Sequence, residues 1–130
     1  MQDANILNGI DVGALQQLAE GVASNPLQGL VTFDVRTNWP GGARSSTKAL
    51  PISLGNQMIA RSFNIEADEP PEILGTNKAA NPQELLLAAL NACMTVGLIA
   101  NAAARGIRNL LLPHRPGLIR VVDQFVLNLL

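Results

Sequence analysis

The chain has 130 residues, the size of one ordinary domain, and its nine basic and ten acidic residues leave a net charge of −1. Only 3% of the residues are aromatic, with one Trp, three Phe and no Tyr. A near-neutral charge and few stacking side chains exclude the electrostatic footprint and the stacking platform of nucleic-acid-binding proteins. We therefore expect no nucleic-acid partner.

The single cysteine, Cys93, cannot form a disulfide within the chain, and one His with one Cys does not make a cluster of zinc ligands. The first residues, MQDANILNGIDVG, contain neither a basic segment nor an apolar run typical of a signal peptide. We expect a cytoplasmic protein that needs no metal and no other cofactor.

Residues 10–23 are predicted to form a short amphipathic helix. Asp11 is a plausible cap, and the apolar residues Val12, Leu15, Leu18, Ala19 and Val22 recur at helical spacing. The helix should end at Asn25-Pro26, because the residue before a proline is pushed out of the helical region.

Residues 30–66 are predicted to form an antiparallel β-meander. Val31, Phe33 and Val35 alternate with polar residues, which is typical of a half-buried strand ending near Trp39. Turn residues follow at Pro40-Gly41-Gly42 and at Gly55-Asn56, so three strands joined by short turns are expected. Such a sheet needs a cover for its apolar face.

Residues 82–105 are predicted to form a long helix that supplies this cover. Asn81 can cap it, Pro82 stands where a missing N–H costs nothing, and Glu84 can reach back as in a capping box. Gly106 supplies a left-handed terminator, and Arg105 is favourably placed against the helix dipole.

The body of this helix carries no charge from Leu85 to Ala104, so it belongs inside protein or inside lipid. Asn91, Thr95 and Asn101 interrupt the apolar run and favour protein. The expected architecture is therefore a single α+β domain, residues 1–130, in which the N-terminal meander packs on a long central buried helix. We expect no membrane partner.

Two further segments are less regular. Residues 67–80 are predicted to be a loop with Ile73-Leu74 as its anchor and Gly75 as a turn. In the tail, residues 109–130, two prolines flank His114, which is expected to be a solvated loop histidine, and IRVVDQFVLNLL has the pattern of a final strand.

The residue types alone leave two interpretations of Cys93. A free cysteine in an apolar helix is commonly a packed small hydrophobe. A reactive thiolate in mid-helix would need a cation from elsewhere, for which Arg36, Arg44 and Arg61 are candidates. Glu84 precedes Cys93 by nine residues, about half a turn away around the helix, and does not reach it directly.

A motif pattern between Asp68 and Cys93 bears on the role of this cysteine. The residues Asp68-Glu69-Pro70, Leu74-Gly75, Asn81-Pro82, Glu84-Leu85-Leu86, Ala89-Leu90 and Cys93 follow the order DEP-x-x-LLG and then NP-x-E-L-L-x-A-L-x-x-C. This pattern resembles one branch of the OsmC family, which includes the organic hydroperoxide resistance (Ohr) proteins. The helix at 10–23, the strand ending at Trp39 and the Gly41-Gly42 turn also fit that branch, and the resemblance extends to Arg108.

The resemblance implies an OsmC-like fold with two chains intertwined as a homodimer. In the thiol-dependent peroxidases of this family the helix cysteine attacks the peroxide, while an arginine and a glutamate at the helix start orient and activate it. Carried over to this chain, Cys93 is the peroxidatic cysteine, and Glu84 and Arg44 are the supporting residues. The implied small-molecule partner is an organic hydroperoxide or another small apolar ligand.

The chain also departs from the family. No second cysteine is present to resolve a sulfenic acid, so turnover would require an external thiol reductant. Gln83 stands where Ohr-type members have their glutamate, although Glu84 is where this branch has its acid. Beyond Arg108 the C-terminal part is altered or truncated: RPGLIRVV is either the remnant of a late strand, or the whole tail is unrelated sequence such as a frameshift gives.

The sequence therefore predicts a thiol-dependent hydroperoxide reductase involved in oxidative-stress defence. The alternative is a non-catalytic, dimeric OsmC-like stress or ligand-binding protein in which Cys93 is a core residue.

Overall fold

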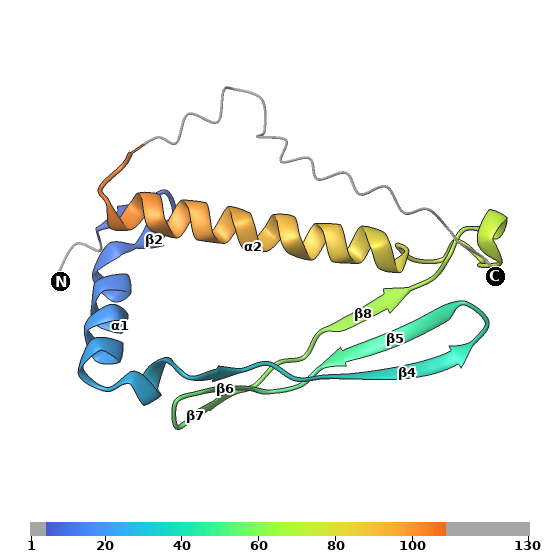
Figure 1. The fold of residues 1–130 in the computed structure, drawn as a ribbon, viewed down its shortest axis with the longest axis horizontal. Coiled ribbons are helices and arrows are strands. Elements are labelled where there is room, and N and C mark those ends of the chain that lie inside the picture. Colours follow the sequence, from blue (N-terminus) through green and yellow to red (C-terminus); the bar gives the residue numbers. More distant parts are fainter. Residues whose placement is uncertain (1–4, 109–130) are drawn as a thin grey trace. The chain divides into compact units, whose positions relative to one another are not determined.

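A computed structural model of the chain describes residues 5–108. The predictions for the tail at 109–130, including its strand and the loop position of His114, lie outside the described residues. Within residues 5–108 the fold is mixed α+β with antiparallel sheets (Figure 1). The chain divides into two compact units, one made of the residues up to Val12 with those from Gln83 onward, the other of Gly13–Pro82.

The first unit begins with a small hairpin that the sequence predictions missed. Strands β1 (Ile6–Leu7) and β2 (Ile10–Asp11) pair antiparallel, with Leu7 opposite Ile10. Asn8 and Gly9 connect them with φ angles of 52° and 81°. Two successive positive φ angles are what a two-residue hairpin turn requires, and Asn-Gly is the commonest pair to adopt them.

Helix α2 (Pro82–Ala104) is the main element of this unit; it begins at the predicted residue and ends one residue before the predicted bound of 105. It starts at Pro82, and Gly106 ends it with a φ of 70°. The N–H of Ile107 donates to the Ala102 carbonyl, and the N–H of Gly106 donates to the Ala103 carbonyl. This pair of hydrogen bonds is the Schellman motif of a helix that ends at a glycine.

The hairpin is joined to this helix end by one side chain. Asn8 Nδ2 donates to the Ile107 carbonyl over 2.9 Å. The buried hydrophobic residues of the unit are Leu7, Ala102 and Ala103, at the hairpin and at the last turn of α2. The core of this unit therefore sits at the C-terminal end of the helix.

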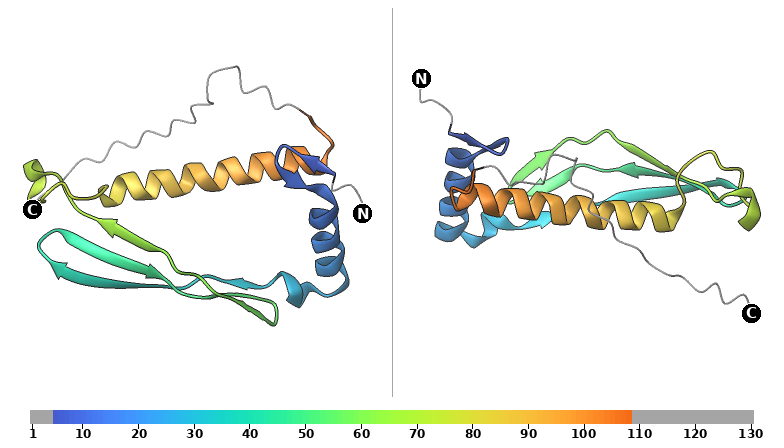
Figure 2. Two further views of the ribbon diagram at one scale, coloured as in Figure 1. Left: turned by 180° about the vertical axis from the view of Figure 1, so that it is seen from behind. Right: turned by 90° about the horizontal axis from the view of Figure 1, so that it is seen from above.

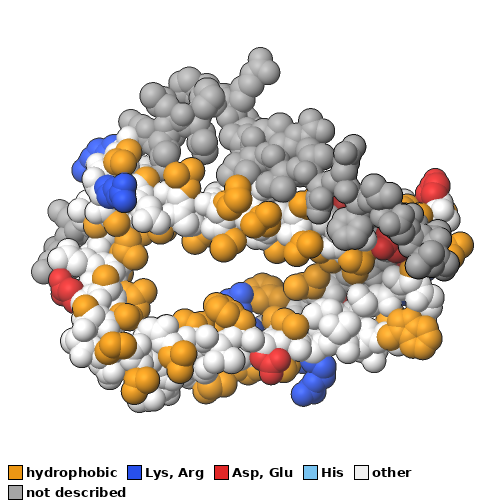
Figure 3. Space-filling model, viewed as in Figure 1, with side chains coloured by type: hydrophobic (Ala, Val, Ile, Leu, Met, Phe, Trp, Pro, Cys, Tyr) orange, Lys and Arg blue, Asp and Glu red, His pale blue; other side chains and the backbone are white. Residues whose placement is uncertain are grey.

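The rest of α2 is exposed in the described structure, so the burial of this helix stays a prediction that requires cover from another part of the chain or from a second copy. Ala102 and Ala103 are its buried residues, and large apolar side chains lie exposed along its body: Leu86, Leu90, Met94, Val96 and Leu98 (Figure 3).

The second unit starts with helix α1 (Val12–Ser24) and the short 3-10 helix η1 (Pro26–Gly29). The predicted helix at 10–23 is thus present from Val12, while Ile10 and Asp11 belong to β2 instead. Asn25 ends α1 as expected, and its side chain then caps η1 by accepting from the Leu27 N–H over 3.2 Å.

The predicted meander is present, but each of its three segments is divided into two strands. The first segment contains β3 (Val31–Thr32) and β4 (Val35–Gly41), the second β5 (Arg44–Ala49) and β6 (Ile52–Leu54), and the third β7 (Gln57–Ile59) and β8 (Asn64–Ala67). They pair antiparallel as two three-stranded sheets, β4-β5-β8 and β3-β6-β7 (Figure 2).

The three segments are interrupted side by side, between β3 and β4, between β5 and β6, and between β7 and β8. Pro51, which lies between β5 and β6, explains the interruption. Pro51 lies in the middle segment, where it has no N–H to donate to a neighbouring strand. The register then moves by one residue: continuing from the pair Val31–Leu54 would set Val35 opposite Leu50, but Val35 pairs with Ala49.

The sheet β4-β5-β8 has one apolar and one polar face, as the alternation predicts. Val35, Thr37, Thr47, Ala49 and Ile65 share the apolar face through their register pairs. Val35 is 58% exposed and Ile65 is 44% exposed, so this face lacks a complete cover. The buried residues of the unit, Ala67 and Asp68, lie where β8 ends.

Candidate functional site

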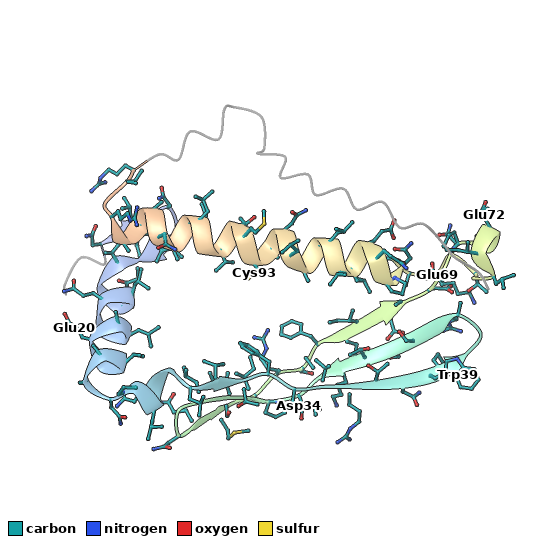
Figure 4. The ribbon with its side chains drawn as sticks, in the orientation of Figure 1. Glu20, Asp34, Trp39, Glu69, Glu72 and Cys93 are labelled. Atoms are coloured by element: carbon teal, nitrogen blue, oxygen red, sulfur yellow. The ribbon has the colours of Figure 1, made fainter. Side chains whose placement is uncertain are left out.

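Cys93 lies in the middle of α2 and is exposed (Figure 4). Its own compact unit therefore does not cover it, and the interpretation of Cys93 as a packed thiol would require cover from another part of the chain or from a second copy. Its exposure leaves the sulfur open to a small molecule, which is the first requirement for a reactive thiol.

The surroundings of Cys93 on α2 are apolar. Side chains three and four residues apart on a helix are neighbours, which places Leu90 and Val96 beside Cys93. Leu90 is 47% exposed and Val96 is 66% exposed. Gly97, one turn after Cys93, has open space where a Cβ would be. The thiol thus lies in an apolar, exposed stripe with a gap next to it.

The helix itself brings no charge to Cys93. Glu84 occupies the first turn of α2, as predicted, about 13 Å along the axis from Cys93 and on the opposite side. Arg105 follows the helix, about 18 Å beyond Cys93. An activating cation would therefore have to come from another element or another chain.

The three candidate arginines lie on the strands or between them, in the other compact unit. Arg36 in β4 and Arg44 in β5 belong to the polar face of their sheet. Arg61 stands over the Phe63 ring, 4.6 Å from its centroid, in a cation–π contact. Arg61 therefore already contacts an aromatic ring. The choice of Arg44 as the cation that activates Cys93 stays a prediction.

Gln83 has a feature that the sequence did not predict. Its side-chain oxygen Oε1 is buried and has no hydrogen-bond partner among the described residues. A buried carbonyl oxygen without a donor costs free energy. Gln83 therefore leaves an acceptor unsatisfied at the start of α2.

The Asp68 carboxylate is buried, with 1% of the residue exposed, and it accepts several hydrogen bonds. It accepts the Glu69 N–H at 2.8 Å, the Thr76 hydroxyl at 2.6 Å, the Thr76 N–H at 3.2 Å and the Lys78 N–H at 3.0 Å. The Thr76 hydroxyl and then the Lys78 N–H lower the pKa of Asp68 to about 2, against the opposing effect of desolvation.

Asp68, and not Ile73-Leu74, anchors the loop before α2. Leu74 is 91% exposed and Ile73 is 40% exposed, so the predicted apolar anchor was wrong. Leu74 ends the short 3-10 helix η2 (Pro71–Ile73) in a left-handed conformation with φ 70°, which turns its side chain outward. The Asp68 N–H also donates to the Ala80 carbonyl over 3.2 Å, which ties the end of the loop to the end of β8.

Elsewhere in this unit an open cleft of about 410 Å³ lies beside α1 and the β6–β7 turn. Its lining consists of Leu18, Gln28, Leu54, Gly55, Asn56 and Gln57. None of the predicted site residues borders it. Among residues 5–108 no three His, Cys, Asp or Glu side chains gather as a set that could hold a metal ion.

Within the described residues, α2 is long and apolar enough to cross a membrane by length and composition, a test that core helices of soluble proteins also pass. No protein-family model and no curated protein matches the sequence.

Proposed function

We propose that the chain is a thiol-dependent hydroperoxide reductase with Cys93 as its peroxidatic residue. The observation that supports the proposal is the exposed thiol in the middle of α2, at the position that the OsmC-like pattern gives to the reactive cysteine. The apolar stripe around it, with Leu90 and Val96 as neighbours, suits the hydrocarbon part of an organic hydroperoxide.

The reaction has three balanced steps. The Cys93 thiolate attacks the terminal oxygen of ROOH, the O–O bond breaks, and the products are Cys93 sulfenic acid and, after protonation, ROH. An external thiol then attacks the sulfenic sulfur, which gives a mixed disulfide and water. A second external thiol releases Cys93 and leaves the disulfide of the reductant. The external thiol is needed because the chain has one cysteine.

Glu84 and Arg44 are proposed as supporting residues. The charges of α2 lie too far along the helix to stabilise a thiolate at Cys93, so a cation from the strands of the same or of a second copy has to do so. Arg44 is proposed for this role, and Glu84 at the helix start is proposed to orient it.

The proposal includes a homodimer of OsmC-like arrangement, in which the sheets pack on the long helices. The exposed apolar side chains of α2 and of the apolar sheet face support it, because soluble proteins rarely leave contiguous apolar surface uncovered. Size-exclusion chromatography coupled to light scattering should give a molecular mass that is twice that of the chain. A monomer that stays in the soluble fraction without detergent would contradict the dimer, and recovery in the membrane fraction would favour a membrane-associated α2.

The test of catalysis is stopped-flow mixing of the reduced protein with cumene hydroperoxide. We expect Cys93 to be consumed faster than free cysteine, with a sulfenic acid trapped by dimedone on Cys93 and absent from Cys93→Ser. Arg44→Gln should slow the reaction, while Arg105→Gln, which removes the same charge from the end of α2, should not. A rate no higher than that of free cysteine would reject the proposal.

The alternative, a non-catalytic OsmC-like stress or ligand-binding dimer, makes the opposite prediction. In it Cys93 is covered by the second copy, so Cys93→Ala should leave both the fold and the resistance of cells to peroxide intact. Loss of peroxide resistance in that variant, with an unchanged melting temperature, would exclude the alternative.

A further inference from the structure

The polar face of the sheet β4-β5-β8 contains two cations in one register row. Arg36 in β4 lies opposite Lys48 in β5, and Lys48 lies opposite Asn64 in β8. The next row on the same face consists of Asn38, Ser46 and Glu66. A guanidinium, an ammonium and a carboxamide therefore project side by side from three neighbouring strands.

This arrangement is unfavourable for the sheet alone. Residues directly opposite in an antiparallel pair have Cβ atoms about 5 Å apart, and like charges at such positions destabilise the pairing. Within residues 5–108 the side chains of Arg36 and Lys48 have no ion-pair or hydrogen-bond partner, and both residues are exposed. Two acids lie close to this row. Asp34, two residues before Arg36, forms no ion pair with it, and Glu66 accepts the Ser46 hydroxyl over 2.6 Å.

We propose that Arg36 and Lys48, with the Asn64 amide beside them, bind a phosphate-type oxyanion. A guanidinium presents a planar fork of donors that matches two oxygens of a phosphate, and a lysine ammonium adds a point charge. The Asn64 amide contributes a neutral N–H donor to a remaining oxygen. The bound anion removes the repulsion between the two cations, so binding stabilises the sheet.

Free phosphorylated compounds and phospholipid headgroups share this chemistry, and two measurements distinguish them. In the first, the melting temperature is recorded with sodium pyrophosphate and with sodium chloride at the same ionic strength. We expect pyrophosphate to raise the melting temperature of the wild type by several degrees more than the chloride does, because the ligand binds the folded state. In the second, the protein is sedimented with vesicles of phosphatidylcholine, with and without phosphatidic acid.

Variants locate the effect. Arg36→Gln and Lys48→Gln should each lose the pyrophosphate effect, whereas Arg105→Gln, with the same loss of charge outside the sheet, should keep it. Lys48→Glu distinguishes loss of the anion site from loss of stability. It replaces the repulsion by an attraction, so it should melt higher than the wild type without ligand and should not respond to pyrophosphate.

Each result decides the proposal. A pyrophosphate effect that Lys48→Gln abolishes supports it and identifies a soluble ligand. Sedimentation with phosphatidic acid that Lys48→Gln abolishes, without a pyrophosphate effect, supports it and identifies a headgroup. The proposal is overturned when the wild type shows neither effect, or when Arg36→Gln and Lys48→Gln retain whichever effect the wild type shows.

Discussion

Replacement of Gly75 by alanine should destabilise the chain more than most single substitutions. A Cβ at this position would overlap the carbonyl oxygen, the carbonyl carbon and the Cα of Glu69. These are backbone atoms, so no rotation of a side chain relieves the overlap. The loop between Glu69 and Gly75 has to open to admit the methyl group.

Opening the loop breaks identifiable hydrogen bonds. The Gly75 N–H donates to the Pro70 carbonyl and the Asn77 N–H to the Glu69 carbonyl, both over 3.0 Å. Each is worth about 1 kcal/mol, and steric overpacking adds about 1–3 kcal/mol. We expect Gly75→Ala to lower the free energy of unfolding by about 3–5 kcal/mol, a large part of the 5–15 kcal/mol typical of a folded protein.

Urea unfolding followed by far-UV circular dichroism measures this loss, and Gly97→Ala provides the matched control. Gly97 lies inside α2 with nothing within 4 Å of an added Cβ. Alanine is favoured over glycine in a helix by about 1 kcal/mol, so this variant should be more stable than the wild type. Shifts of the same sign in the two variants, or a loss below about 1 kcal/mol for Gly75→Ala, would refute the reasoning.

Further predictions concern Asp68 and Asn8. The lowered pKa of Asp68 means that its stabilising effect is complete above its ordinary pKa of 3.8 and is lost as the pH falls through about 2. Asp68→Asn should therefore be less stable than the wild type at neutral pH, and the difference should shrink towards pH 2 in acid unfolding curves; a constant difference would contradict the assignment. Asn8→Ala removes the bond to Ile107 and forces a left-handed alanine, a loss of about 2 kcal/mol. Asn8→Gly removes the bond alone and should cost about half as much by thermal unfolding; equal losses would show that the φ angle of Asn8 is irrelevant.

Features that depend on near neighbours in the chain could be predicted from the sequence. The ends of α2 follow from Pro82 and Gly106, and the hairpin turns follow from Gly41-Gly42 and Gly55-Asn56. The Asn8-Gly9 turn carries an equally clear signal, but its strands of two residues each are too short for an alternating pattern to be recognised.

The interruption of the meander required knowledge of the pairing. Pro51 looks like a local break in one strand, but in the sheet it lies on the middle segment and removes a donor from the ladder. One residue therefore divides three segments at once. The pairing of Arg36 with Lys48 likewise follows from the register, because Lys48 comes twelve positions after Arg36 in the sequence and yet lies opposite it in the sheet.

By itself, the sequence determined the types and approximate bounds of the elements, the two-faced character of the strands and the position of the only cysteine on a long apolar helix. These follow from turn chemistry, capping and hydrophobic period, which act over a few residues. The tertiary structure decided that the buried Asp68 carboxylate, and not Ile73-Leu74, holds the loop, because its donors Thr76 and Lys78 come from eight and ten residues further along. It also decided that Cys93 is exposed, since burial depends on which distant segments reach a side chain and not on how apolar its neighbours in the sequence are.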